Sequence, residues 1–125
     1  MNGGNLDDST VYFIGGYYRN TLFQSYHAFA KLQVSDCGIR IGPSLRAFRF
    51  LVPEWSSPYD DLQEVRALDR LIYGGAIGFR RLGVVRPAVF ITQERTKILD
   101  ALESRGCSVE RYPISFSRFF ALSAI

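Results

Sequence analysis

The sequence predicts an α+β domain that is mainly β, in which several antiparallel strands precede one C-terminal helix. Apolar and polar residues alternate along residues 25–35, as they do in a strand with one buried face. Short runs rich in β-branched and aromatic residues then recur up to Thr92. After Thr92 the apolar residues recur with a helical period. Because the strands precede the helix and do not alternate with helices, the order disfavours a parallel, doubly wound sheet.

The first residues, 1–22, are interpreted as a flexible or accessory segment. Residues 1–10 are polar and rich in glycine and asparagine, which is typical of a frayed end. Residues 11–23 are dense in aromatic side chains but are interrupted by Gly15 and Gly16. This stretch could form an extra pair of strands, a flap over the core or a surface for a partner.

Turn residues delimit the expected strands. Asp36 and Gly38 end the first strand, Pro53 ends the third, and a turn at Gly83 follows the fifth. The strands are expected over residues 25–35, 39–41, 46–52, 62–68, 76–80 and 88–92.

A helix is expected over residues 93–105. Thr92 can cap its first turn, and Gly106 stands where a helix commonly ends in a left-handed glycine. Its apolar stripe consists of Ile98, Leu99 and Leu102.

Glycines cluster at positions 74, 75, 78 and 83, which raises the question of a phosphate-binding loop. A dinucleotide fingerprint would need glycine two positions before Gly75, where the chain has Tyr73. No Gly-Lys-Ser or Gly-Lys-Thr follows, and a strand-like run comes next. We therefore expect these glycines to serve turns and bulges, with no nucleotide ligand.

The charge balance is modest: 15 lysine and arginine residues face 12 aspartate and glutamate residues, for a net charge of +3. A nucleic-acid partner is not expected, because such proteins normally carry a larger excess gathered on one face. The bases nevertheless concentrate in residues 37–53 and 70–91, separated by the acidic residues 54–69. Neighbouring strands could neutralise one another, or the bases could form an anion-binding or partner-binding patch. That candidate patch consists of Lys31, Arg40, Arg46, Arg49, Arg80, Arg81 and Arg86.

No set of residues for catalysis, metal binding or cofactor binding is expected. His27 is the only histidine, and the neighbours Asp60 and Asp61 would point to opposite faces of a strand. Cys37 and Cys107 are too few for a disulfide framework or a four-ligand zinc site, and their spacing matches no metal motif. Reduced thiols, with no secretory signal or membrane-length apolar run, favour a cytoplasmic protein.

Residues 23–111 resemble small bacterial proteins with a pleckstrin-homology-like (PH-like) domain. The resemblance is carried by "VSDCGIRI", by "PYDDLQEV" and by "LESRG" at the end of the helix. It implies an antiparallel barrel of about six or seven strands, capped by the C-terminal helix, with Ile98, Leu99 and Leu102 plugging the core. In lipid-binding PH domains, bases around the first hairpin hold inositol phosphates. Lys31 and Arg40 could take the first two places of that pattern, but Gly42 occupies the third.

The resemblance implies a non-enzymatic binding or scaffolding module for protein interaction or self-association. The alternatives are a peripheral membrane module that binds anionic headgroups through the arginines, and a small enzyme of unknown class. The hydrophobic tail, residues 112–125, is a further candidate association surface. If it is helical, Phe116, Phe119 and Phe120 share one face, which could pack on the domain or on a partner.

Overall fold

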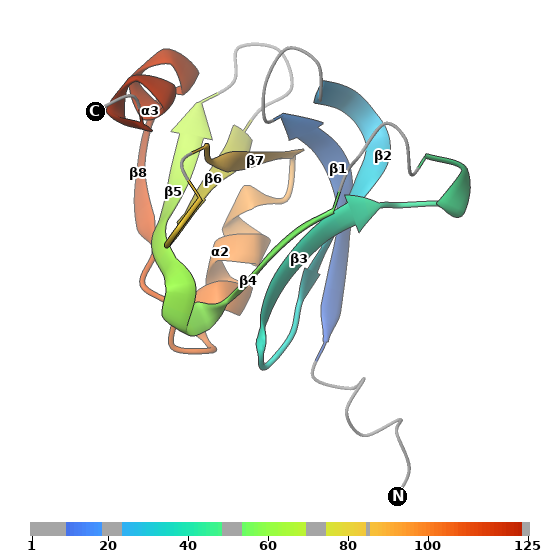
Figure 1. The fold of residues 1–125 in the computed structure, drawn as a ribbon, viewed down its shortest axis with the longest axis horizontal. Helices are drawn as coiled ribbons and strands as arrows, with labels where there is room; N and C mark the ends of the chain where they lie inside the picture. Colours follow the sequence, from blue (N-terminus) through green and yellow to red (C-terminus); the bar gives the residue numbers. More distant parts are fainter. Residues whose placement is uncertain (1–9, 19–23, 49–53, 70–74, 85, 124–125) are drawn as a thin grey trace, which may run out of the picture.

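The computed structural model describes residues 10–18, 24–48, 54–69, 75–84 and 86–123, and its strands form one strongly curved sheet (Figure 1). The strands are β1 (Val11–Tyr18), β2 (Gln24–Val34), β3 (Gly38–Pro43), β4 (Trp55–Pro58), β5 (Leu62–Asp69), β6 (Gly75–Arg81), β7 (Ala88–Thr92) and β8 (Glu110–Ser115). The helices are α2 (Arg95–Glu103) and α3 (Phe116–Ser123), with the short 3-10 turns η1 (Arg46–Phe48) and η2 (Tyr59–Asp61).

The prediction of an α+β, mainly β domain is confirmed, but the strand number and the barrel closure were wrong. Among the described residues, the sheet has eight strands in the order β4-β3-β2-β1-β7-β6-β5-β8, so its two edges, β4 and β8, do not pair with each other. Every pair is antiparallel except β5 with β8. The strands that were not expected include β1, in the interior of the sheet, and β8, which begins at Glu110 and runs into the tail. β4, with only four residues, ends the other edge.

Strand β1 lies inside the sheet, between β2 and β7. Residues 11–18 therefore belong to the sheet, although the sequence suggested an accessory segment up to residue 22. The two glycines do not break the strand, because the register with β2 shifts between Gly15 and Tyr17 as in a β-bulge. A Cβ atom on Gly15 would overlap the carbonyl oxygen of Ile91, so glycine permits the close approach of β7.

The strand expected over residues 46–52 is not present where the structure describes it. Arg46–Phe48 is one 3-10 turn, and residues 49–52 lie outside the described residues. The next strand is β4, where Trp55 turns into the core and Ser56 faces solvent. Three residues are too few for periodicity to distinguish a tight helical turn from a strand.

Helix α2 fills the inside of the curved sheet (Figure 1). Its side chains Ile98, Leu99 and Leu102 are buried against the inward side chains of the strands, which confirms their expected place in the core. The Thr92 hydroxyl accepts a hydrogen bond from the Glu94 amide at 2.8 Å, and Gly106 has a φ of +85° just after the helix.

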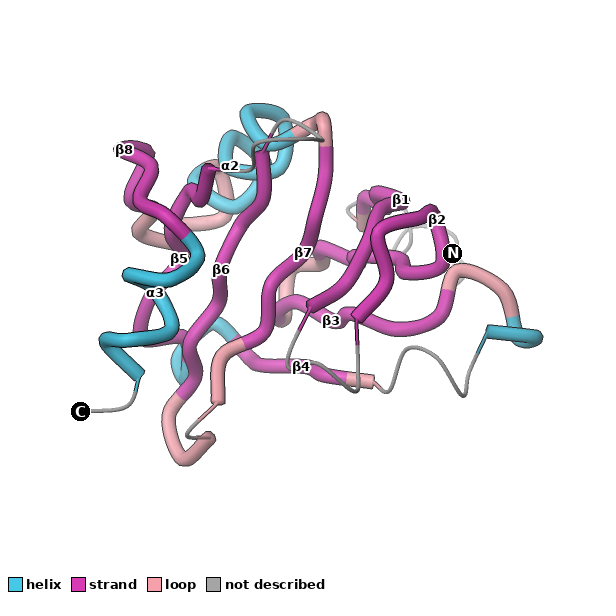
Figure 2. Tube along the Cα trace, turned by 90° about the horizontal axis from the view of Figure 1, so that it is seen from above, coloured by secondary structure: helices cyan, strands magenta, loops and turns pink. Residues whose placement is uncertain are grey.

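A second, smaller core lies on the outer face of β5, β6 and β7. Helix α3 covers it, and Figure 2 shows α3 on the side of β5, β6 and β8, away from β1, β2 and β3. Phe119 of α3 is completely buried there, and a Cβ atom on Gly78 of β6 would overlap its ring. The buried members of this second core are Leu68, Ala76, Val89, Ile91 and Phe119. One half of the sheet is thus covered on both faces.

Candidate functional site

The outer face of the other half, β1 to β4, carries an ordered array of side chains. The strand register places Tyr12 beside Gln33, Gln33 beside Arg40, and Arg40 beside Ser56. A second row runs from Ile14 through Lys31 to Gly42. We call this surface the β1–β4 face; it comprises Tyr12, Ile14, Lys31, Gln33, Arg40, Gly42, Glu54 and Ser56.

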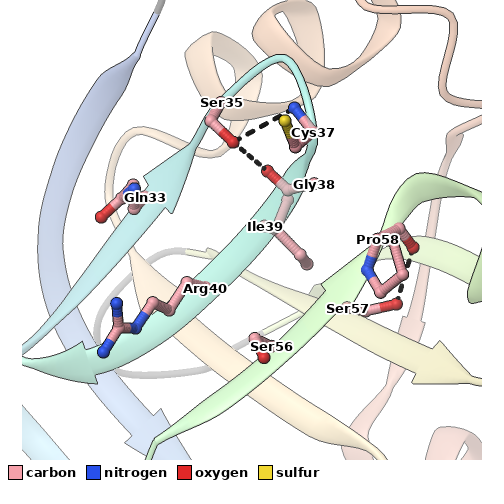
Figure 3. A pocket seen from close by; sticks show the side chains of 9 residues that line it. All are labelled: Gln33, Ser35, Cys37, Gly38, Ile39, Arg40, Ser56, Ser57 and Pro58. Carbon is pink, nitrogen blue, oxygen red and sulfur yellow. Dashed lines mark hydrogen bonds between the residues drawn. The ribbon is translucent and has the colours of Figure 1, made fainter. Parts of the chain in front are cut away.

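A groove runs along β3 on this face, made of two adjoining hollows that share Gln33 and Arg40. One hollow has a volume of about 290 Å³ and lies toward the β2–β3 turn (Figure 3). The other has a volume of about 180 Å³ and lies toward Pro43. Arg40 is the exposed side chain of β3, whereas Gly38 and Gly42 are buried. A Cβ atom on Gly38 would overlap the backbone of Ser57, and one on Gly42 would contact the Glu54 side chain. The walls come from β2 and from residues 54–58. We call this feature the β3 groove.

Two cationic side chains, Lys31 and Arg40, line the Pro43 end of the β3 groove. Arg40 Nη2 lies 2.6 Å from Glu54 Oε2, and both side chains are more than half exposed, at 53% and 57%. Such an exposed pair exchanges readily with solvent. The Lys31 ammonium lies 5.1 Å from the centre of the Tyr12 ring, within the range of a cation–π contact. The groove therefore presents two positive groups and one carboxylate.

The other end of the β3 groove is fixed by hydrogen bonds. Ser35 Oγ donates to the Gly38 carbonyl at 3.1 Å and accepts from the Cys37 amide at 3.3 Å (Figure 3). The Tyr59 hydroxyl donates to the Ser35 carbonyl from the core side. Burial raises the pKa of Tyr59 to about 12, despite the lowering effect of the nearby Arg105 guanidinium. This end of the groove is preformed, because its turn is tied to the core.

Of the members of the predicted basic patch that the structure describes, Lys31 and Arg40 come together in one hollow. Arg46 lies exposed on η1, and Arg86 is exposed in the turn before β7. Arg49 lies outside the described residues. Lys31 and Arg40 lie on β2 and β3, whereas the first hairpin of the described sheet is β1–β2.

Arg80 serves the fold on the opposite half of the sheet. Its Nε donates to Glu64 Oε1 at 2.7 Å, its Nη2 donates to the Phe119 carbonyl, and its guanidinium lies 4.1 Å from the centre of the Phe119 ring. Arg66 donates to the other Glu64 oxygen, also at 2.7 Å. Burial raises the pKa of Glu64, but the hydrogen bonds from Arg66 and Arg80 outweigh it, so the pKa is lowered overall.

Arg81 is also engaged within the chain. It donates to the Ser56 carbonyl and lies 3.4 Å from Asp61 Oδ2. Asp60 and Asp61 themselves form part of the 3-10 turn η2, so the strand argument that separated their side chains does not apply.

The candidate association tail packs on its own domain. Phe119 is buried, and the half-buried Phe116 and Phe120 lie against Tyr18 at ring-centre distances of 5.8 and 5.3 Å. These aromatic contacts tie α3 to the end of β1.

Sequence reasoning missed the apolar and polar members of the β1–β4 face. Tyr12 and Ile14 lie in the stretch interpreted as accessory, and Glu54 lies between two of the expected strands. Their alternation with the inward residues Val11 and Phe13 was the available signal, but only the pairing of β1 with β2 shows which neighbours they meet.

The described ranges contain no group of three or more His, Cys, Asp and Glu side chains that could hold a metal ion. Cys37 and Cys107 are both free thiols, and burial raises the pKa of Cys107. The side chain of His27 lies outside the described residues. Within the described part of the chain, neither helix has the length and apolar character needed to cross a bilayer.

The fold and its surface groove define a mainly β domain of the α+β class, built from an open, curved sheet around one helix. No family model and no curated protein matches the chain. Among solved structures it is similar to the C-terminal domain of an unknown protein from Leishmania infantum. The TM-score is 0.57 at 14% sequence identity, over 76% of this chain and 80% of that chain. At this identity the likeness concerns the fold alone.

Proposed function

We propose that the protein is a non-enzymatic, PH-like interaction module that binds another protein chain through the β1–β4 face. The observation that carries the proposal is the unequal covering of the sheet. Helix α3 buries the outer face of β5–β7, whereas Tyr12 and Ile14 on the β1–β4 face are 52% and 47% exposed. Large apolar side chains grouped on an open face are typical of interaction surfaces.

The composition of the β1–β4 face supports a protein partner. Tyr12 and Ile14 offer an aromatic and an aliphatic anchor, while Lys31, Gln33 and Arg40 supply a polar rim. Protein interfaces combine such anchors with polar surroundings. Four hydrogen-bonded strands hold these side chains, so little backbone ordering is needed on binding.

The test is selection from a displayed library of short random peptides, followed by anisotropy measurements on the selected peptides. We expect saturable binding that weakens about tenfold in the double variant Tyr12→Ala/Ile14→Ala, because anchor residues dominate interface energies. Leu82→Ala is the matched control, since Leu82 is 59% exposed in the β6–β7 turn on the other half of the sheet.

The proposal fails if no peptide binds saturably, or if Leu82→Ala weakens binding and the double variant does not. Pelleting with vesicles of phosphatidylserine is run in parallel at two salt concentrations. Salt-sensitive pelleting without peptide binding would favour the peripheral membrane module instead.

A further inference from the structure

We propose that the β3 groove recognises an extended acidic peptide, and that Glu54 occupies the place on Arg40 that a carboxylate of the peptide takes. The inference rests on the proposed function and specifies the partner. In the free protein, the Arg40–Glu54 pair then acts as an internal competitor for the ligand.

The charge of the groove favours an acidic ligand. Lys31 and Arg40 face a single carboxylate, that of Glu54. Among the described residues, no carboxylate forms an ion pair with Lys31, whose ammonium instead lies against the Tyr12 ring. The three side chains keep one positive charge in excess, so an incoming carboxylate finds a complementary site.

The position of Glu54 shows how a carboxylate lies on Arg40. Its Oε2 accepts a 2.6 Å hydrogen bond from Arg40 Nη2, and its Cγ lies 3.5 Å from where a Cβ atom on Gly42 would be. The Glu54 side chain thus lies across the floor of the groove at a glycine. Because both charged groups are more than half exposed, replacing one carboxylate by another costs little.

The shape of the groove favours an extended chain over a compact headgroup. The two hollows meet at Gln33 and Arg40 and together follow β3 from Gly38 to Pro43. A strand of that length spans about 20 Å, at about 3.3 Å per residue. The side chains of Gln33 and Ser56 make no hydrogen bond within the described residues, so both are available to the backbone of a peptide.

The experiment uses two fluorescent peptides, one of alternating glutamate and valine and one of alternating glutamine and valine. We expect the folded, full-length protein to bind the acidic peptide at least about tenfold more tightly. Glu54→Gln should raise that affinity severalfold, because it removes the internal competitor. Arg40→Gln and Lys31→Gln should each lower it by about tenfold.

Arg118→Gln is the charge-matched control. It removes one positive charge from an exposed position on α3, which covers the other half of the sheet. Its affinity should stay within about twofold of the unchanged protein, because a distant exposed charge is screened by salt. Circular dichroism confirms that each variant is folded.

The outcomes separate this inference from the proposed function. If library peptides bind through Tyr12 and Ile14 but the neutral peptide binds as well as the acidic one, the inference is overturned and the function stands. An unchanged or lowered affinity in Glu54→Gln also overturns it. If neither the library nor the designed peptides bind, both fail. If vesicles bind in a way that depends on Lys31 and Arg40 and no peptide binds, the ligand is an anionic lipid surface and the inference of a peptide ligand is overturned.

Discussion

Gly78, Phe119 and Arg80 illustrate how single residues determine which face of the sheet is covered. A Cβ atom at position 78 would overlap the tip of the Phe119 ring, so the ring can approach β6 this closely only where the strand has glycine. The Arg80 guanidinium lies on the same ring and is held by Glu64. The sequence predicted turns and bulges for the clustered glycines. Gly83, with a φ of +82°, lies in the turn after β6, whereas Gly78 lies within β6 and accommodates the Phe119 ring, which the sequence did not show.

Replacing Phe119 with alanine should lower the free energy of unfolding by about 3–5 kcal/mol, because it leaves a cavity between α3 and the sheet. Urea denaturation measures the change. Tyr112→Ala is the control from the same tail, and since Tyr112 is 81% exposed its effect should stay below about 0.5 kcal/mol. Equal effects of the two substitutions would show that α3 does not pack as described.

Tyr59 gives the stability a defined pH dependence. Its pKa is raised from 10.0 to about 12 in the folded protein, first through burial, so the unfolded chain releases the phenol proton at a lower pH. The contribution of Tyr59 to stability is therefore complete below pH 10.0 and disappears as the pH rises to about 12. In Tyr59→Phe, stability at neutral pH should fall by about 1 kcal/mol through loss of the hydrogen bond to Ser35.

The pH dependence of stability above pH 10.0 distinguishes the titration of the Tyr59 hydroxyl from general alkaline unfolding. We expect the difference in unfolding free energy between the unchanged protein and Tyr59→Phe to shrink between pH 10.0 and about 12. A difference that stays constant over that range would contradict the assignment to the Tyr59 hydroxyl.

At the scale of elements, the sequence predicted the strands and the helix whose structure is determined mainly by the pattern of their own residues. The alternation in β2, the apolar runs of β6 and β7, and the capped stripe of α2 were all recognised. By contrast, β8 contains Pro113, has mostly exposed side chains, and pairs in parallel with β5, which is distant in sequence. β4 has four residues, two of them serine. Such edge strands depend on tertiary pairing, which no local pattern reports.

The tail can be tested as an element by ending the chain at Tyr112. Loss of α3 would expose the buried apolar side chains Leu68, Ala76 and Ile91. We therefore expect the shortened chain to unfold at a lower temperature and to gain mass by aggregation in light scattering, since large apolar patches promote association. A shortened chain that stays monomeric, with a full-length chain that forms oligomers, would show that the tail drives assembly instead.

At the scale of the whole molecule, the curved sheet holds α2 inside and carries α3 on only one half of its outside (Figures 1 and 2). The mainly β class followed from strand periodicity, and two residues of the candidate site, Lys31 and Arg40, followed from charge. The rest of the site needed the strand order. Tyr12 meets Lys31 only because β1 lies beside β2, and Glu54 meets Arg40 only because the chain returns beside β3.

The most direct test of the binding face is a nuclear magnetic resonance titration of isotope-labelled, full-length protein with the alternating glutamate–valine peptide. If the β1–β4 face binds, the largest shifts in backbone amide signals should come from Lys31, Gln33, Arg40 and Gly42, with little change in α3 and β6. Largest shifts in α3, β5 and β6, with β2 and β3 unchanged, would contradict the assignment of the binding face.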